Sequence, residues 1–515
     1  MSANILWADD EIDLLKPHIM FLEQKGYEVS TVTNGADAVE KVENEQFDIV
    51  FLDENMPGLT GLETLTKIKS IDNLLPVIMI TKSEEEHIME DAIGGKISDY
   101  LIKPVNPNQI LLSLKKNLDD KKLISEKTSS NYQREFRELG MRINDRLEWD
   151  EWVEVYQKLI YWELELERSG DIGMKEILKM QKSEANSQFC RFVEDNYLEW
   201  TNDAADNAPP LSDSILKNKV FPIADESPVF LIVIDNLRQD QWKILKPLIS
   251  PYFNIDSEEC FFSILPTATH YARNALFSGM MPSEMEKKHR DIWLNEDQEG
   301  GKNMHEQEFL QANLSRNNKT YKASYNKITN LNSGKKLVDN FNQLENYHLN
   351  VIVYNFVDML SHARTEMEVI KELADDEAAY RSLTRSWFDH SPLKEIMMKI
   401  ADKGFKMIIT TDHGTVKVDE PIKIVGDRNT NTNLRYKVGR GLSYNEKEVY
   451  RIKEPSEGKL PQHALSSEFV FAKNDQFFVY PNNYNHYVSY YRDTFQHGGI
   501  SMEEMIIPFV VCSAK

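Results

Sequence analysis

Short apolar runs alternate with amphipathic stretches along the first 120 residues. Four of these runs, NILWA, FDIVFLD, LPVIMI and DYLIK, have the length of buried strands, and helical patterns lie between them. Strands that alternate with helices are typical of a doubly wound parallel sheet. The pattern therefore predicts an α/β domain over residues 1–120.

A helical pattern replaces this alternation in residues 121–205. Apolar side chains advance there by three and four positions, as on one face of a helix, at Trp152, Val155, Leu159, Trp162 and Leu166. The stretch TNDAADNAPPLSDS (201–214) then marks a linker through its Pro, Asp and Asn residues. We expect a helical bundle that transmits a signal or dimerises rather than catalyses.

The alternation of strand and helix returns in residues 206–515. PVFLIVIDNLR (228–238), VIVYNFVDMLSH (351–362) and FKMIITTDHG (405–414) each begin as a strand and end in polar residues, and a further strand closes TFQHGGISMEEMIIPFVV (494–511). This predicts a second α/β domain. Residues 283–347 and 415–495 lack the alternation, so we expect caps over a site, with Lys437 and Arg440 facing either substrate or solvent.

Composition narrows the possible functions. The chain is 41% hydrophobic, has three widely separated cysteines and carries a net charge of −23. No apolar run has the length of a membrane span, the N-terminus lacks a basic signal region, and the cysteines fit a reducing compartment, which predicts a cytoplasmic protein. The acidic charge and the absence of a helix-turn-helix pattern argue against stable duplex DNA binding. One phosphate could still bind beside a metal.

Polar residues stand at the strand ends of the first domain. Asp9 and Asp10 follow the first run, Asp53 ends the second, Thr81 ends the third and Lys103 follows the fourth. Active sites of parallel α/β sheets lie at the carboxyl ends of the strands. Carboxylates that hold Mg²⁺, one of which attacks a phosphoryl group, would form an acyl phosphate there.

The motifs WADDE, FLDENMPGLTGLE, MITK and DYLIKP resemble the receiver domains of bacterial response regulators, which have a flavodoxin-like, CheY-like fold. The resemblance implies a sensor histidine kinase as partner and Asp53 as the phosphoacceptor. It also implies a Mg²⁺ site made by Asp9, Asp10, Asp53 and the Asn55 carbonyl. Thr81, Tyr100 and Lys103 would form the switch, and the bond before Pro104 is expected to be cis.

A second group of polar residues follows the strands of the last 300 residues. It contains three carboxylates and three imidazoles, namely Asp235, Asp358, His362, Asp412, His413 and His497. Such a set can hold two Zn²⁺ ions, and two neighbouring ions can clamp a phosphoryl group. Asp358 alone could instead cap a helix, with His362 on the surface.

PTATHYARN and HGGISMEEMIIP resemble the PglZ branch of the alkaline phosphatase superfamily over residues 215–515. The resemblance implies a zinc-coordinated Thr269 as nucleophile, with Thr267 as the nearest rival. One metal would bind Asp235, Asp412 and His413, and the other Asp358, His362 and His497. Arg273 and Asn274 would hold phosphate oxygens, or are ordinary polar residues of a helix start.

A receiver joined to a PglZ domain resembles PorX-type response regulators, which control type IX protein secretion in Bacteroidetes. The resemblance implies homodimerisation on phosphorylation and two Zn²⁺ per chain. It also implies a phosphodiesterase-like output on nucleotides or oligonucleotides, and contact with a sigma factor or a secretion-system protein. The alternative is a signalling and interaction module whose metal domain is mainly structural.

Overall fold

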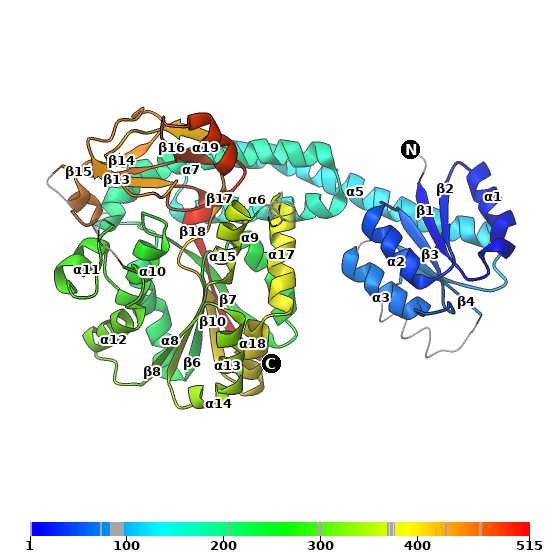
Figure 1. The fold of residues 1–515 in the computed structure, drawn as a ribbon, viewed down its shortest axis with the longest axis horizontal. Helices are drawn as coiled ribbons and strands as arrows, with labels where there is room; N and C mark the ends of the chain where they lie inside the picture. The colour runs from blue at the N-terminus through cyan, green and yellow to red at the C-terminus, as the bar shows by residue number, and fades with distance from the viewer. Residues whose placement is uncertain are drawn as a thin grey trace. The chain divides into compact units, whose positions relative to one another are not determined.

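The computed structural model describes residues 3–72, 75–82, 97–202, 206–296, 298, 300–367, 370, 374, 376–427, 430–462 and 466–515. For residues 119–127, 172, 362–364 and 366 it describes the backbone alone. The chain divides into two compact units (Figure 1). Unit 1 contains Met1–Phe136 and Glu163–Lys175, and unit 2 contains Arg137–Trp162 and Glu176–Lys515.

The first unit contains a parallel five-stranded sheet in the order β2-β1-β3-β4-β5. Alternate residues of β1 enter different cores, Ile5 and Trp7 on one face and Leu6 and Ala8 on the other. This two-sided burial confirms the predicted doubly wound fold. The strands are β1 (Asn4–Ala8), β2 (Glu28–Val32), β3 (Ile49–Asp53), β4 (Val77–Thr81) and β5 (Asp99–Ile102), and the helices include α1 (Lys16–Gln24), α2 (Gly35–Asn44) and α3 (Gly61–Ile71).

Three long helices form the middle of the chain, as predicted: α5 (Pro107–Ile143), α6 (Trp149–Ser169) and α7 (Ile172–Thr201). The predicted apolar stripe on α6 is buried from Trp152 to Leu166. The boundary predicted at residue 120 falls inside α5, because no proline or glycine stands between Pro107 and Gly140 to end the helix. Among the described helices, none combines the length and hydropathy that a membrane crossing requires.

The second unit is built on a six-stranded sheet in the order β7-β18-β10-β6-β9-β8. Four strands are parallel, whereas β18 runs antiparallel to both of its neighbours. This arrangement confirms a second α/β domain, in which helices cover the sheet (Figure 1). The strands are β6 (Val229–Ile234), β7 (Phe253–Phe262), β8 (Ala323–Ile328), β9 (Leu349–Tyr354), β10 (Lys406–Thr410) and β18 (Ile506–Ala514).

One of the two predicted caps is part of the central fold. Residues 283–347 supply the edge strand β8, whose sequence ASYNKI leaves most of its side chains half-buried. Because polar and apolar residues are mixed along this strand, its sequence lacks the apolar run that predicts a buried strand. The helices of the unit include α8 (Phe221–Glu226), α9 (Gln239–Ile249), α10 (Thr269–Ser278), α11 (Pro282–Lys288), α12 (Glu306–Arg316), α13 (Leu331–Asp339), α14 (Phe341–Leu344), α15 (Phe356–Glu366), α17 (Glu377–Asp389), α18 (Pro392–Asp402) and α20 (Met502–Met505).

Residues 415–495 form small sheets outside the central one. A three-stranded sheet has the order β13-β15-β14, and two-stranded sheets pair β11 with β17 and β12 with β16. We call this region the cap. Its elements are β11 (Val416–Lys417), β12 (Glu420–Lys423), β13 (Tyr436–Arg440), β14 (Tyr450–Ile452), β15 (Ser467–Phe471), β16 (Gln476–Val479), α19 (Tyr484–Tyr491) and β17 (Phe495–Gln496).

Candidate functional site

Three carboxylates gather at the carboxyl ends of strands β1 and β3 in the first unit. One oxygen each of Asp9, Asp10 and Asp53 lies within 4.8 Å of the others. Lys103 Nζ lies 2.9 Å from Asp9 Oδ2 and 2.9 Å from Asp53 Oδ1. Burial raises the pKa of Asp53, and the hydrogen bond from Lys103 opposes this rise. These residues can hold a hard cation beside the predicted phosphoacceptor.

The predicted switch residues lie on neighbouring strands. Thr81 ends β4 and donates a hydrogen bond to the carboxylate of Glu54, a residue that the sequence did not single out. Tyr100 on β5 is 37% exposed, and Asn55 is exposed in the turn after β3. The Lys103–Pro104 peptide bond is cis, as predicted.

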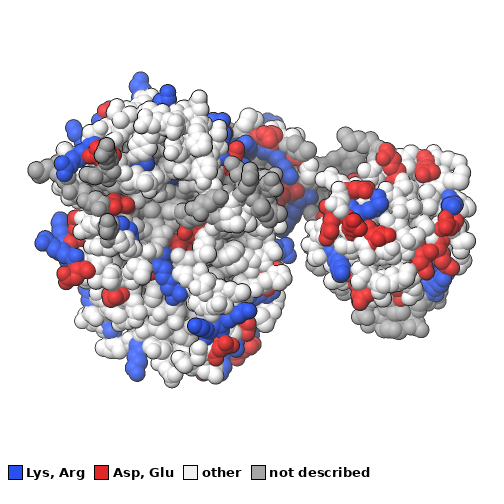
Figure 2. All heavy atoms as spheres, viewed as in Figure 1, with Lys and Arg blue, Asp and Glu red and all other residues white. Residues whose placement is uncertain are grey.

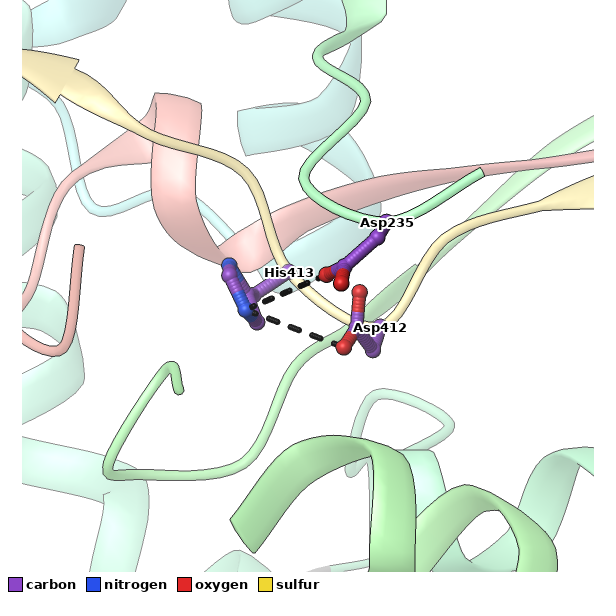
Figure 3. A group of neighbouring side chains, drawn as sticks. All are labelled: Asp235, Asp412 and His413. Atoms are coloured by element: carbon purple, nitrogen blue, oxygen red, sulfur yellow. Dashed lines mark ion pairs between the residues drawn. The ribbon is translucent and has the colours of Figure 1, made fainter. Parts of the chain in front are cut away.

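The second unit brings Asp235, Asp412 and His413 together directly after strands β6 and β10. Figure 3 shows the two carboxylates converging with the imidazole ring. His413 Nε2 lies 3.9 Å from Asp235 Oδ1 and 3.7 Å from Asp412 Oδ2. All three side chains are buried. The sequence prediction placed these residues in one metal site, and their geometry is compatible with it.

Two backbone features fix this loop geometry. Asn236 adopts a left-handed conformation with φ 66°, which turns the chain directly after Asp235, and its backbone N–H donates to Asp412 Oδ1 at 3.4 Å. Asparagine tolerates this conformation better than most residues. Gly414 follows His413, and a Cβ atom there would lie 2.0 Å from the Glu503 carbonyl oxygen. The motif DHG therefore needs its glycine for close packing.

The two candidate nucleophiles have different surroundings. Thr269 is the first residue of α10 and lines a cavity, with its Oγ1 3.1 Å from His413 Nε2. Thr267 is buried, donates to the Gly499 carbonyl at 2.8 Å and accepts from the Gly498 N–H at 3.1 Å. The hydroxyl of Thr267 thus holds the glycine loop, and of the two candidate nucleophiles Thr269 is the one that lines the cavity.

The second predicted ligand set is described in part. Asp358 lies in the first turn of α15, and its Oδ1 is 3.7 Å from His497 Nε2. The rings of His497 and His413 stack with centroids 4.3 Å apart. The backbone of His362 belongs to α15, but its side chain lies outside the described residues. The two described members lie next to the first group.

Arg273 and Asn274 have partners other than the phosphate expected from the sequence. Arg273 is fully buried, with Nη1 2.7 Å from Asp235 Oδ2 and Nε 2.6 Å from Glu306 Oε1. Asn274 donates to the backbone carbonyls of His270 and Lys302. Neither residue lines the cavity at Thr269. The Arg273 guanidinium pairs with buried carboxylates because a buried charge without a partner raises the free energy of the folded state.

The cavity beside Thr269 has a volume of about 550 Å³. Its lining includes Asp358 and His497, together with side chains that the sequence did not indicate: His270, Glu296, Tyr436, Tyr490 and Tyr491. His270 and the Tyr436 hydroxyl both contact Glu296.

The two cap residues expected near substrate do not line this cavity. Lys437 is buried and donates to the Asn431 carbonyl, and burial lowers its pKa to about 7. Arg440 is exposed. Loop position alone could not tell these environments apart, because β13 buries only some of its side chains.

The first group of ligands fits a metal ion chemically. Asp412 Oδ2 is buried and accepts no hydrogen bond from the described residues. Burial raises the pKa of Asp235 well above its usual value, Arg273 opposes the rise, and the carboxylates of Asp412 and Asp358 add to it. Two carboxylates and an imidazole are ligands that a borderline cation such as Zn²⁺ accepts. A divalent cation would neutralise this crowded negative charge.

The buried pairs of Arg273 predict a stability effect. Arg273→Met leaves the buried carboxylate of Asp235 without its guanidinium partner, while Glu306 keeps its pair with Lys327 at 2.9 Å, so we expect the free energy of unfolding to fall by about 3–5 kcal/mol. Lys219→Met is the matched control, because its pair with Glu259 is exposed and worth about 0–1 kcal/mol. Urea unfolding of both metal-free variants measures the difference, and equal losses would contradict the prediction.

Comparison with known proteins assigns the class of this chain. Residues 5–115 match the response regulator receiver domain, 122–201 the PorX response regulator linker domain, and 215–512 the BREX system PglZ alkaline phosphatase-like domain. These matches define a response regulator with an alkaline phosphatase-like output domain. The chain belongs to the PglZ family, and its three parts together are those of a PorX-type response regulator. Its receiver implies a phosphodonor such as a histidine kinase.

Curated relatives and solved structures match the receiver part. The chain is 35% identical over 115 residues to the transcriptional regulatory protein CpxR homolog of Haemophilus influenzae, covering 22% of this chain and 49% of that protein. It is 32% identical over 123 residues to the regulatory protein PgtA of Salmonella typhimurium, covering 24% and 30%. The chain thus spans half or less of these relatives.

A CheY-like receiver domain protein from Methanospirillum hungatei JF-1 has a TM-score of 0.23 and 29% identity, covering 23% of this chain and 96% of that structure. The chemotaxis response regulator CheY4 of Vibrio cholerae has a TM-score of 0.22 and 29% identity, covering 23% and 100%.

Proposed function

We propose that the second unit is a zinc-dependent phosphodiesterase that acts on nucleotides or oligonucleotides under control of phosphorylation at Asp53. The observation that carries the proposal is the Thr269 hydroxyl, which lies at the cavity within 3.1 Å of His413, beside the buried carboxylates of Asp235 and Asp412. Alkaline phosphatase-like proteins are hydrolases, so the family membership supports the same reaction class.

The predicted ligands form two zinc sites of three residues each. Asp235, Asp412 and His413 would hold one zinc ion, and Asp358, His362 and His497 the other. Bound zinc would supply positive charge that lowers the pKa of a hydroxyl and attracts phosphate oxygens.

The reaction itself would use Thr269 and water. Thr269 Oγ gives up its proton and forms a bond to phosphorus, while the bond to the leaving alkoxide breaks and that alkoxide takes up a proton. Water then attacks phosphorus, releases the phosphomonoester and restores the hydroxyl of Thr269.

One experiment tests this function directly. Zinc content of the purified chain is measured together with hydrolysis of a phosphomonoester, a phosphodiester and short linear and cyclic oligonucleotides. We expect about two zinc equivalents and preferential turnover of phosphodiesters. A zinc-loaded chain that hydrolyses no phosphodiester would instead favour the structural or interaction role of the metal domain.

His362 offers a specific prediction for the second metal ion. Asp358 lies one helical turn earlier on α15 and faces His497 at 3.7 Å, which leaves the site one imidazole short without His362. His362→Ala should lower bound zinc by up to one equivalent and suppress phosphodiester hydrolysis. His390→Ala, an exposed histidine after α17, serves as control. If His362→Ala retained all of its zinc, Asp358 would be a helix cap and not a zinc ligand.

The signalling role extends this proposal. The match of residues 122–201 to the PorX linker supports a function in type IX protein secretion, with a sensor histidine kinase as partner and a sigma factor or a secretion-system protein downstream. Secretion by cells whose only copy carries Asp53→Ala tests it, and unimpaired secretion would count against this role.

A further inference from the structure

Helix α19 of the cap exposes aromatic side chains that its packing does not require. Tyr484, Val488 and Tyr491 pack against the apolar cluster below, at the spacing of one helical face. Tyr487 and Tyr490 lie three residues apart on another face and are 39% and 40% exposed. Both rings therefore have surface that a ligand can reach.

These rings continue the wall of the cavity at Thr269. Tyr490 and Tyr491 line the cavity together with Asp358 and His497, and their rings touch edge to face with centroids 4.9 Å apart. The rings of Tyr487 and Tyr491 lie nearly parallel, 6.1 Å apart. A series of aromatic faces therefore leads from the reacting position toward the outer surface of α19.

Positive charge beside these rings already has partners: Lys423 Nζ lies 4.8 Å from the centroid of the Tyr484 ring, and Arg492, directly after α19, has its Nε 3.2 Å from Asp419 Oδ1. Among the described residues that line the cavity, Lys302 is the single lysine or arginine, and its ammonium group already donates to the backbone carbonyls of Asn295 and Gln298. Figure 2 shows few lysine and arginine side chains on the face where Figure 1 draws α19. The whole chain carries a charge of −23. Phosphates beyond the reacting one would therefore find little electrostatic attraction.

We propose that Tyr487 and Tyr490 form a base-stacking surface that binds the nucleobases flanking the reacting phosphodiester. The substrate class would then be a single-stranded nucleotide chain with bases on either side of the scissile bond, rather than a phosphodiester of any kind. Bases have flat π faces that stack on aromatic side chains regardless of sequence, so affinity comes from rings instead of cations. This inference rests on the proposed phosphodiesterase function and assigns its substrate class.

The test uses the full zinc-loaded chain with Thr269→Ala, so that bound nucleotides are not cleaved. Isothermal titration calorimetry compares tetradeoxyadenylate with an abasic tetramer of the same backbone and charge. We expect tighter binding of tetradeoxyadenylate. Tyr487→Ala and Tyr490→Ala should each weaken that binding by about 5- to 150-fold and leave the affinity for the abasic tetramer unchanged.

Two matched variants control for effects other than ring loss. Tyr490→Phe keeps the ring and should keep the affinity. Tyr161→Ala removes a tyrosine that is 55% exposed on α6 and should change neither affinity. Unchanged binding of the abasic tetramer also shows that the α19 variants are folded.

Three outcomes would overturn the inference. They are equal affinity of the starting chain for the two tetramers, unchanged binding of tetradeoxyadenylate in both alanine variants, and failure of tetradeoxyadenylate to bind at all. The proposed function fails by a different measurement, the absence of phosphodiester turnover in the zinc-loaded chain with Thr269 intact. The two failures are therefore distinguishable.

Discussion

Thr269→Ala should lower phosphodiester hydrolysis by the zinc-loaded chain by at least about 10³-fold, because loss of a nucleophile removes the covalent route altogether. Thr269 Oγ1 lies at the cavity, 3.1 Å from His413 Nε2, and no other atom of the side chain could form the bond to phosphorus. Steady-state rates with a chromogenic phosphodiester measure the loss. Metal analysis of the same sample should show zinc retained, since the carboxylates and imidazoles remain.

Thr365→Ala is the matched control for this variant, because Thr365 also lines the cavity but donates its hydroxyl to the Ser361 carbonyl of its own helix. We expect it to keep most of the activity. If Thr269→Ala hydrolysed the diester at the wild-type rate, the nucleophile would lie elsewhere, with Thr267 as the first residue to examine.

Asp53→Ala should abolish acyl-phosphate formation in the receiver. The carboxylate of Asp53 ends β3 in contact with Lys103 and beside Asp9 and Asp10, and alanine offers no oxygen to attack a phosphodonor. Labelling with a small phosphodonor and Mg²⁺ should fall to background. This loss of label should occur without a change in zinc content, because the proposed zinc ligands belong to the second unit.

Asp13→Ala provides the control for Asp53→Ala, since Asp13 is an exposed carboxylate near the same sheet edge and pairs only at the surface with Lys16. Analytical sedimentation compares the oligomeric states of wild type and the two variants. A phosphoryl mimic should increase the dimer fraction of wild type and of Asp13→Ala, but not of Asp53→Ala. Undiminished labelling of Asp53→Ala would show that another residue accepts the phosphoryl group.

The sequence predicted the parts of the fold in which local pattern and burial agree. Strands β3 and β4 are buried along their full length, and their apolar runs could be read directly. The polar residues that follow parallel strands could be grouped because such strands end at one edge of the sheet. The edge strand β2 escaped prediction, although the edge strand β5 did not: Val32 is the one buried residue of β2, and the sequence EVSTV therefore resembles a loop.

Partners far apart in the sequence could not be predicted. Arg273 stands one turn after Thr269 on α10, where a phosphate contact was a reasonable expectation, yet its guanidinium joins Asp235 to Glu306 on α12. Whether Arg273 contacts a phosphate or these carboxylates depends on how α10 packs against α12. The aromatic surface of α19 was missed for a similar reason. The stretch YNHYVSYY shows a cluster of rings, but only packing decides which of them remain exposed.

The position of β18 has a consequence for the synthesis of the chain. This strand, Ile506–Ala514, is the last of the six to leave the ribosome, yet it occupies an inner place between β7 and β10. Translation therefore exposes the hydrogen-bonding edges of β7 and β10 until β18 has been made. The nascent second unit would need protection from wrong pairing during that interval, and the loop with His497, which precedes β18, would reach its place only when that strand inserts.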